Sequence, residues 1–370
     1  MKYYLIVGEA SGDLHASKLM RELKCLDEDA NFRFWGGDLM KSQGGEIVKH
    51  YKELAFMGFL EVVKNLRTIL SNIDLCKKDI KSYQPDVVIL VDYPGFNIRI
   101  AEFVKSIGIK VFYYISPQVW AWKESRVSKI KRFVDRMFVI LPFEKAFYKK
   151  FNYDVDFVGH PLLDAVEEDM NKPSNLSIIS DKPIIALLPG SRKQEIAVML
   201  PIMLSVVKHY KDYQFVLAAT STHGKAFYDE FIGNFDNVKV VYGQTYALLK
   251  NAYAALVTSG TATLETALFK VPEVVCYKGG AVSYVIAKSL INVDYISLVN
   301  LIMEDEVVKE LVQSELKELN LKDALDNILK EENRAEVINN YDLLASKLGG
   351  SGASKKTADL MIGYLKKYRK

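Results

Sequence analysis

Cysteine is scarce in this sequence, and long apolar runs are missing. The 370 residues include 3 cysteines, Cys25, Cys76 and Cys276, which are too far apart for a zinc-binding spacing or a disulfide framework. A reducing compartment is therefore expected. Gly8 interrupts the apolar residues 3–7 before they reach the length of a signal-peptide core, and no run approaches the ~20 residues of a bilayer span. These features predict a cytoplasmic protein without a membrane-spanning segment.

An excess of charge of one sign is missing as well. The 49 Lys and Arg residues nearly balance the 46 Asp and Glu residues, so the net charge of +3 does not indicate a nucleic-acid partner. Hydrophobic residues make up 49% and charged residues 26%, which is typical of a globular protein with a substantial core. The length suits two or three domains.

Short apolar segments alternate with helical patterns in the first half of the chain. Continuously apolar strands are typical of a parallel sheet that is covered on both faces. The expected strands are 3–7, 32–35, 87–91, 111–115 and 138–141.

The turn after the first strand, 8–13, leads into a helix expected over 14–26 and lacks the spacing of the dinucleotide fingerprint. Glycines, Ser11 and Asp13 at such a turn favour an anion or hydroxyl site, but we interpret Asp13 as a helix N-cap first. His15 is interpreted as a partly buried or surface histidine.

Asp92 follows the apolar strand 87–91 and precedes the Pro94-Gly95 turn. Ligands of open α/β sheets collect at the carboxyl ends of strands. A carboxylate at this place is a candidate general base. A turn-forming or capping aspartate is the alternative.

Two helical patterns in the first half have unusual faces. The apolar residues from Met57 to Ile73 form a wide face, which predicts either a buried core helix or a lipid-facing surface. The helix 123–136 turns its Lys and Arg residues outward, as a solvated face or toward an anionic membrane. His160, before a proline, either reaches a cleft between domains or fixes a turn. The D-x-D segment 154–156 is interpreted as surface and implies no metal.

The polar segment 171–182 is typical of an interdomain linker. A second set of strands is expected at 184–187, 215–219, 238–242, 254–258 and 273–277. Helices are expected at 307–313, 322–330, 334–348 and, after the flexible joint 349–352, at 353–370. The last helix is placed to pack back on the first domain or onto a second subunit of a homodimer.

The whole pattern predicts an α/β fold with two doubly wound, Rossmann-like domains that face a cleft. We expect a first domain over 1–172, completed by the helix 353–370, and a second domain over 183–345.

Two turns in the second half pass from a buried strand into a helix. Gly190-Ser191-Arg192 offers backbone N–H groups, a helix dipole and a guanidinium fork to an anion; an ordinary turn with a solvated Arg is the alternative. The turn 258–263 offers hydroxyls and N–H groups, and Glu265 can accept from a ribose diol. A capping box is its alternative. Together the two turns favour a nucleotide site.

Six segments, in this order and at these separations, resemble the lipid-A-disaccharide synthase family. They are Gly8-Glu9-Ala10-Ser11-Gly12-Asp13, Asp92-Tyr93-Pro94-Gly95-Phe96-Asn97, Ser116-Pro117-Gln118-Val119-Trp120-Ala121-Trp122, Gly159-His160-Pro161, Leu188-Pro189-Gly190-Ser191-Arg192 and Ser259-Gly260-Thr261-Ala262-Thr263-Leu264-Glu265. The likeness runs from residue 3 to 315 or so. One departure is that Ser297-Leu298-Val299-Asn300 lacks the proline expected before the Asn.

The resemblance implies a GT-B glycosyltransferase that uses neither a catalytic metal nor a cofactor. The family transfers 2,3-diacylglucosamine from UDP to 2,3-diacylglucosamine 1-phosphate with inversion, which forms the β-1,6 disaccharide precursor of lipid A in lipopolysaccharide synthesis. It works at the inner face of the cytoplasmic membrane as a peripheral protein. By position, Asp92 is the base, Arg192 meets the diphosphate and Glu265 holds the ribose. The nucleotide site further includes Gly190, Ser191, Ser259, Gly260, Thr261, Ala262 and Thr263.

Further candidates for the acceptor side or the cleft are Glu9, Ser11, Gly12, Asp13, Asn97, Gln118, Trp120, His160 and Asn300. Two other functions remain open at this point. A UDP-sugar epimerase shares the architecture, and a non-catalytic lipid-binding protein at the membrane surface would use the apolar and basic faces but neither phosphate turn.

Overall fold

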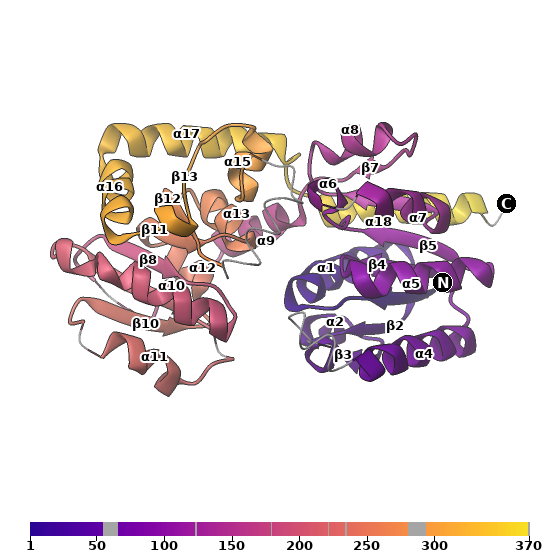
Figure 1. The fold of residues 1–370 in the computed structure, drawn as a ribbon. Helices are drawn as coiled ribbons and strands as arrows, with labels where there is room; N and C mark the ends of the chain where they lie inside the picture. The colour runs from indigo at the N-terminus through magenta and orange to yellow at the C-terminus, as the bar shows by residue number, and fades with distance from the viewer. Residues whose placement is uncertain are drawn as a thin grey trace. The chain divides into compact units, whose positions relative to one another are not determined.

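A computed structural model describes residues 1–54, 66–122, 124–178, 180–220, 222–233, 235–279 and 294–368. It divides into two compact units, each built on one sheet (Figure 1). Unit 1 comprises Met1–Asp164 and Leu348–Lys370, and unit 2 comprises Ala165–Lys347.

The sheet of unit 1 has seven parallel strands in the order β3-β2-β1-β4-β5-β6-β7. They are β1 (Lys2–Ile6), β2 (Asn31–Gly36), β3 (Glu46–His50), β4 (Val87–Val91), β5 (Lys110–Tyr114), β6 (Arg136–Val139) and β7 (Asp156–Phe157). The chain runs from β1 outward through β2 and β3, then returns to β4 on the other side of β1. The ends of β1 and β4 therefore form the topological switch point, where such sheets bind ligands.

Helices cover both faces of this sheet. One face carries α4 (Leu66–Tyr83), α5 (Pro94–Ser106) and α7 (Val127–Phe133), whose apolar side chains share a core with Tyr4, Ile6 and Tyr113. Helix α1 (Ala10–Leu26) instead packs against α18 (Ala353–Tyr368) and α2 (Asp38–Ser42). Shorter elements are α6 (Val119–Trp122), α8 (Glu144–Lys149), η1 (Tyr51–Glu53) and η2 (Glu124–Arg126). Both faces are buried, which accounts for the continuously apolar strands.

The sheet of unit 2 has six parallel strands in the order β10-β9-β8-β11-β12-β13. They are β8 (Ile184–Leu188), β9 (Gln214–Ala219), β10 (Val238–Tyr242), β11 (Ala252–Thr258), β12 (Glu273–Tyr277) and β13 (Lys309–Val312). The helices are α10 (Lys193–Ser205), α11 (Lys225–Ile232), α12 (Thr245–Leu249), α13 (Thr261–Leu268), α15 (Leu298–Met303), α16 (Glu318–Leu329) and α17 (Glu331–Lys347), with η3 (Val207–His209) and η4 (Gln313–Glu315). The switch point of this sheet lies between β8 and β11.

The first stretch of unit 1 ends within helix α9 (Pro161–Met170), at Asp164. The first turn of α9 bonds the C-terminal segment of unit 1, Leu348–Lys370. The carboxylate of Asp164 accepts from the backbone N–H groups of Gly352, Ala353 and Ser354, at 2.5, 3.3 and 3.1 Å. These are the first N–H groups of α18, which a helix leaves without internal partners. The yellow helix α18 is thereby capped within unit 1 (Figure 1). The predicted fold class, including the C-terminal helix that packs back, is confirmed.

Two local predictions were wrong. The helix expected over 307–313 is the strand β13, which pairs with β12. Its Glu310, typical of a solvated helix, is buried and accepts from the N–H groups of Ile296 and Ser297, each at 2.9 Å. The first helix begins at Ala10 rather than residue 14 and includes Gly12. A Cβ at position 12 would lie 3.1 Å from Val7, so glycine avoids a tight contact there.

Glu273 is a buried carboxylic acid at the start of β12. It is 0% exposed, and among the described residues neither of its carboxylate oxygens has a hydrogen-bond partner. Burial, and after it the charge of Glu310, raises the pKa of Glu273 well above its usual range. Folding therefore requires the acid to keep its proton, and the cost of keeping it grows as the pH rises above the ordinary pKa of Glu.

We expect Glu273→Gln to raise the melting temperature at about pH 8, because the amide removes this cost. In a unit of this size each kcal/mol gained corresponds to about 2–4 °C. The gain should vanish near pH 4, where the unfolded chain is also largely protonated. Calorimetry at both pH values measures it, with Glu310→Gln as a control that loses hydrogen bonds and is destabilised. An equal shift at both pH values would contradict the protonated state.

Candidate functional site

Two carboxylates follow neighbouring strands at the switch point of unit 1. Glu9 comes after β1 and Asp92 directly after β4, and these strands pair in register with Ile6 opposite Leu90. Burial raises the pKa of Asp92 to about 7, and the negative charge of nearby Glu9 contributes to the rise. A carboxylate with this pKa can accept a proton at neutral pH more effectively than an ordinary aspartate.

The side chain of Asn97 bonds the backbone at Asp92. It is fully buried on α5, and its Nδ2 donates to the carbonyl oxygens of Asp92 and Val91, at 2.7 and 3.2 Å. From the sequence, Asn97 was a candidate for the side of the acceptor substrate or for the cleft. The structure uses its Nδ2 to bond the backbone at Val91 and Asp92.

Two polar side chains that follow β1, Ser11 and Asp13, have different partners. Ser11 Oγ donates to Glu9 Oε1 at 2.9 Å, which orients the carboxylate beside Asp92. Asp13 instead accepts from the N–H groups of Gly37, Leu39 and Met40, at 2.8, 3.0 and 3.1 Å. The interpretation of Asp13 as the N-cap of its own helix was therefore wrong. Position 13 lies one turn inside α1, and its carboxylate anchors the loop that begins α2.

His160 is buried where α9 begins. The ring Nδ1 of His160 accepts from the backbone N–H of Leu162 at 3.2 Å. The backbone N–H of His160 donates to the carbonyl of Leu348 at 3.1 Å. Burial lowers the pKa of His160 to about 3 and that of His15, whose ring centroid is 6.5 Å away, to about 4. Both imidazoles are therefore neutral at pH 7, and His160 fixes the turn.

The remaining candidates of unit 1 lie around α6. Gln118 is exposed at the start of this short helix, whereas Trp120 is partly buried and its ring meets Phe143 edge-on at 4.9 Å. The structure therefore leaves the Gln118 side chain accessible and uses part of Trp120 in packing.

The two predicted anion turns of unit 2 lie at adjacent strand ends. Strands β8 and β11 pair with Leu188 opposite Val257, so the turns 189–192 and 259–260 follow neighbouring strands. Helix α10 begins at Lys193 and α13 at Thr261, which directs two positive helix ends to one edge of the sheet. Ser191, Arg192, Gly260 and Thr261 are exposed there. The structure thus brings together turns that are nearly 70 residues apart in the chain.

One N–H group of the first turn is already bonded within the protein. Glu195 Oε2 accepts from the N–H of Ser191 at 3.1 Å. Gly190 has a φ of +102°, and a Cβ added to it would lie 2.0 Å from that carboxylate oxygen. The sequence predicted that this turn offers its N–H groups to an anion. At Ser191 this was wrong, because the side chain of Glu195, in the first turn of α10, already accepts from that N–H.

The second turn is braced by its own hydroxyls. Ser259 Oγ donates to the carbonyl of Ile296 at 3.0 Å, and Thr263 Oγ1 to that of Gly260 at 2.8 Å. Ala262 is partly buried on the same helix. Glu265 Oε1 accepts from the hydroxyl of Tyr246 at 2.8 Å, and burial raises the pKa of Glu265. Tyr246 therefore fixes the orientation of the carboxylate proposed to meet the ribose.

Asn300 is a structural residue of unit 2. It is 0% exposed, its Nδ2 donates to Val308 O and Glu310 Oε1 at 2.8 and 2.9 Å, and its Oδ1 accepts from Val308 N at 3.0 Å. All its side-chain polar groups are thus used to join α15 to β13. The prediction of Asn300 as a cleft residue was therefore wrong.

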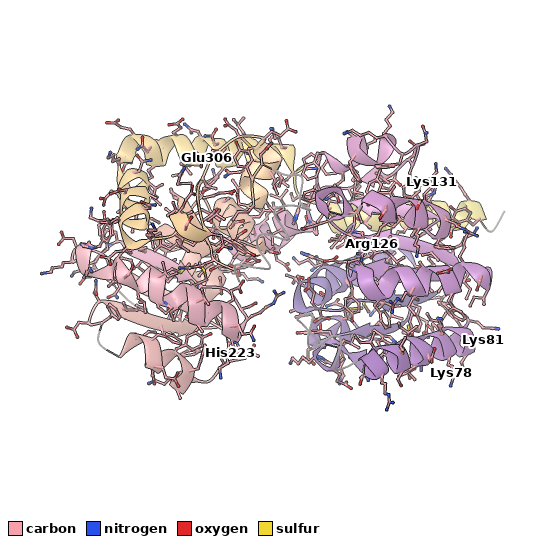
Figure 2. The ribbon with its side chains drawn as sticks, in the orientation of Figure 1. Lys78, Lys81, Arg126, Lys131, His223 and Glu306 are labelled. Atoms are coloured by element: carbon pink, nitrogen blue, oxygen red, sulfur yellow. The ribbon has the colours of Figure 1, made fainter. Side chains whose placement is uncertain are left out.

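His223 was not among the residues predicted from the sequence. It lies in the turn after β9, the other neighbour of β8 (Figure 2). Its Nε2 is 3.0 Å from the carbonyl oxygen of Ser191. The run Thr220 to Gly224 after an apolar strand is the signal that marks this turn.

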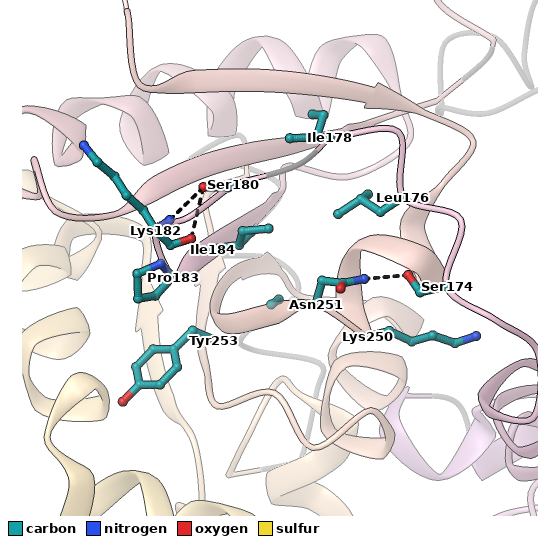
Figure 3. Close-up of a pocket in the computed structure, with 11 residues that line it drawn as sticks. Ser174, Leu176, Ile178, Ser180, Lys182, Pro183, Ile184, Lys250, Asn251 and Tyr253 are labelled. Atoms are coloured by element: carbon teal, nitrogen blue, oxygen red, sulfur yellow. Dashed lines mark hydrogen bonds between the residues drawn. The ribbon is translucent and has the colours of Figure 1, made fainter.

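A cavity of 630 Å³ lies at the opposite edge of the same sheet (Figure 3). Its walls are Ser174, Leu176, Ile178, Ser180, Lys182, Pro183, Ile184, Lys250, Asn251, Ala252 and Tyr253. These residues belong to the segment before β8 and to the amino ends of β8 and β11. Asn251 Nδ2 donates to Ser174 Oγ at 2.7 Å and so attaches the segment to the sheet. The cavity is separate from the anion turns.

Within the described ranges, no cluster of three or more His, Cys, Asp or Glu side chains is arranged to hold a metal ion. Nor does the described part of the chain contain a helix long and apolar enough to cross a membrane.

Solved structures define the class of fold. The chain is similar to UDP-GlcNAc 2-epimerase from Neisseria meningitidis bound to UDP-GlcNAc, with a TM-score of 0.68 and 13% identity over 99% of this chain and 100% of that one. It is also similar to the S. aureus MnaA–UDP co-structure, with a TM-score of 0.70 and 14% identity over 99% and 96%. The calicheamicin glycosyltransferase CalG4 gives 0.59 and 14% over 99% and 98%. The architecture is that of GT-B glycosyltransferases and related epimerases.

Sequence comparisons identify the family within this class. The family model described as lipid-A-disaccharide synthetase matches residues 3–361. The lipid-A-disaccharide synthase of Syntrophus aciditrophicus is 39% identical over 98% of this chain and 97% of its own length, and that of Geobacter metallireducens is 37% identical over 99% and 97%. The chain belongs to the lipid-A-disaccharide synthase family and is a glycosyltransferase.

Proposed function

We propose that this protein transfers 2,3-diacylglucosamine from UDP to the 6-hydroxyl of 2,3-diacylglucosamine 1-phosphate. The products are the β-1,6-linked disaccharide and UDP. The observation that carries the proposal is Asp92, a partly buried carboxylate at the switch point of unit 1 whose pKa is raised to about 7, in a chain of this family. A hydroxyl nucleophile needs such a base.

The proposed step is one displacement with inversion. Asp92 accepts the proton of the acceptor hydroxyl while the hydroxyl oxygen forms a bond to the anomeric carbon of the donor. The bond between that carbon and the UDP oxygen breaks, and its electron pair leaves with UDP. Negative charge therefore grows on the diphosphate, and fixed positive groups aimed at that charge lower the barrier.

Unit 2 supplies those groups in the proposal. The guanidinium of Arg192 and the N-termini of α10 and α13 meet the diphosphate, and Glu265 accepts from the ribose diol. The adjacency of β8 and β11 supports this assignment because it places both turns at one sheet edge. In unit 1, Glu9 and Ser11 are the proposed neighbours of the acceptor, since they lie at the strand end that Asp92 shares.

Acceptor dependence tests the proposed function. Incubation with UDP-2,3-diacylglucosamine and the 1-phosphate acceptor should yield disaccharide and UDP, and omission of the acceptor should stop UDP release. Conversion of the donor alone into a C2 epimer would support the epimerase alternative instead. Failure to bind UDP in a calorimetric titration would favour a non-catalytic lipid-binding role.

We further propose that the protein associates peripherally with the inner face of an anionic membrane. The donor and the acceptor both carry acyl chains, and η2–α7 presents exposed cations beside the buried Val127 and Ile130. Figure 2 labels two residues of this segment, the exposed Lys131 and the partly buried Arg126. The apolar segment expected to join it runs from Met57 to Ile73, and its part at 57–65 lies outside the described residues, as does Lys123.

Charge reversal should weaken this association. Basic residues near an anionic surface contribute about 1 kcal/mol each, so the triple variant Lys129→Glu, Lys131→Glu, Arg132→Glu should bind vesicles at least about 100-fold more weakly. Co-sedimentation with vesicles that contain anionic lipid measures it. Reversal of Lys355, Lys366 and Lys367 on α18 is the matched control. Equal losses in both variants, or no loss in the first, would rule out this surface.

A further inference from the structure

The backbone that carries Asp92 has an unusual conformation. Asp92 has a φ of +44° and Tyr93 a φ of +49°, so two consecutive non-glycine residues lie in the left-handed region. L-residues with side chains avoid this region, and such residues persist only where the surroundings enforce them. The turn between β4 and α5 must therefore be held by its neighbours.

Two buried side chains hold the carbonyl of Asp92. Asn97 Nδ2 donates to it at 2.7 Å and also to the carbonyl of Val91 at 3.2 Å. The hydroxyl of Tyr113, on the adjacent strand β5, donates to the same Asp92 oxygen at 2.5 Å. Asn97 and Tyr113 are both 0% exposed, so the side chains that donate these hydrogen bonds are shielded from water.

Packing fixes the other side of the turn. The Tyr93 ring covers Gly8, where an added Cβ would lie 2.4 Å from the ring, and it stacks on Phe96 with centroids 5.5 Å apart. Gly8 precedes Glu9, so the contact also ties the two carboxylate-bearing turns together. The Asp92 peptide is held through its carbonyl, and the following residue through its ring.

We infer that Asn97 and Tyr113 are positioning residues for the reaction, and that they hold the left-handed Asp92 turn so that its carboxylate stays where the acceptor hydroxyl is deprotonated. This inference rests on the proposed function. Neither side chain is assigned to substrate, and both act through the backbone of Asp92. A catalytic group displaced by about 1 Å can lose about 10²-fold in rate, so the two side chains should matter for turnover more than for binding.

The test compares Tyr113→Phe and Asn97→Ala in two backgrounds, wild type and Asp92→Asn. Tyr114→Phe is the matched control, because Tyr114 is the next residue of β5 and its side chain points toward α18 instead. In the wild-type background we expect kcat to fall about 10–100-fold for each positioning variant, with KM for the UDP-sugar unchanged. The control should retain full kcat. In the Asp92→Asn background neither variant should reduce the residual rate further.

An equal fold-loss in both backgrounds would overturn the inference, because a general loss of structure does not depend on the base. Unchanged kcat in Tyr113→Phe would overturn it as well. Tyr113→Phe removes only one oxygen, so it keeps the test valid if Asn97→Ala fails to fold.

A crystal structure of Tyr113→Phe adds a readout that needs no activity. A change of the Asp92 φ toward negative values supports the inference, and an unchanged turn contradicts it. If wild type itself produces no disaccharide, the proposed function fails, while the φ of Asp92 still reports on whether Tyr113 holds the turn.

Discussion

Asn in place of Asp92 lowers kcat by about 10²–10⁴-fold and leaves the Kd for UDP unchanged, because the amide keeps the size of the side chain but cannot accept the proton. Single-turnover rates and calorimetric UDP titration measure the two quantities. Asp154→Asn, at an exposed aspartate of unit 1, is the matched control and should retain full activity. Unchanged turnover in Asp92→Asn would remove this residue from the role of base.

The pH dependence follows from the same carboxylate. Burial raises the pKa of Asp92 to about 7, and only the deprotonated form can act as the base. The rate of wild type should therefore fall tenfold per pH unit below about pH 7 and level off above it. Asp92→Asn should lose this acidic limb. A limb that survives the substitution would assign the titration to another group.

Arg192→Ala is the second substitution with a large expected effect. Removal of one preorganised positive group from a site of developing charge costs about 10²–10³-fold in rate, and here the Kd for UDP should rise too. Arg192→Lys should recover only part of the loss, because an ammonium lacks the planar fork that bonds two phosphate oxygens. Lys193→Ala, at the next exposed residue, is the control. A normal Kd and kcat in Arg192→Ala would contradict the leaving-group assignment.

The sequence was sufficient for the strands that are buried on both faces. The predicted strands at 87–91 and 273–277 coincide with β4 and β12, because a short apolar run between turn residues is typical of a strand in a parallel sheet. The short edge strands β3 and β7 and the partly charged β13 were not predicted. Their residues are apolar on one side at most, and a neighbouring strand decides their structure.

The candidate site was predictable only where local sequence determines it. Asp92 and the turn of Arg192 follow buried strands directly, so their places at strand ends could be inferred. That Glu9 lies beside Asp92, or that the turns at 190 and 260 are neighbours, depends on strand order, which composition and spacing do not encode.

Partners on other elements of the fold account for the errors about individual side chains. Asp13 bonds the loop at 37–40, and Asn300 bonds Val308 and Glu310. Each residue type is also common in catalytic sites, and only the folded structure shows that its donors or acceptors are already satisfied. The bond from Ser191 to Glu195 was easier to predict from the sequence, since a Glu in the first turn of a helix often accepts from the backbone that precedes the helix.

The proposed reaction is a single displacement in which unit 1 supplies the base and unit 2 holds the leaving group. The anomeric configuration of the disaccharide formed from UDP-α-diacylglucosamine and the 1-phosphate acceptor tests it most directly. Proton NMR of the product should show a β-1,6 linkage, inverted at the donor carbon, and no disaccharide should form from Asp92→Asn above a residual rate. An α linkage would mean retention at the donor carbon, as two successive displacements produce, and would contradict the single displacement with inversion.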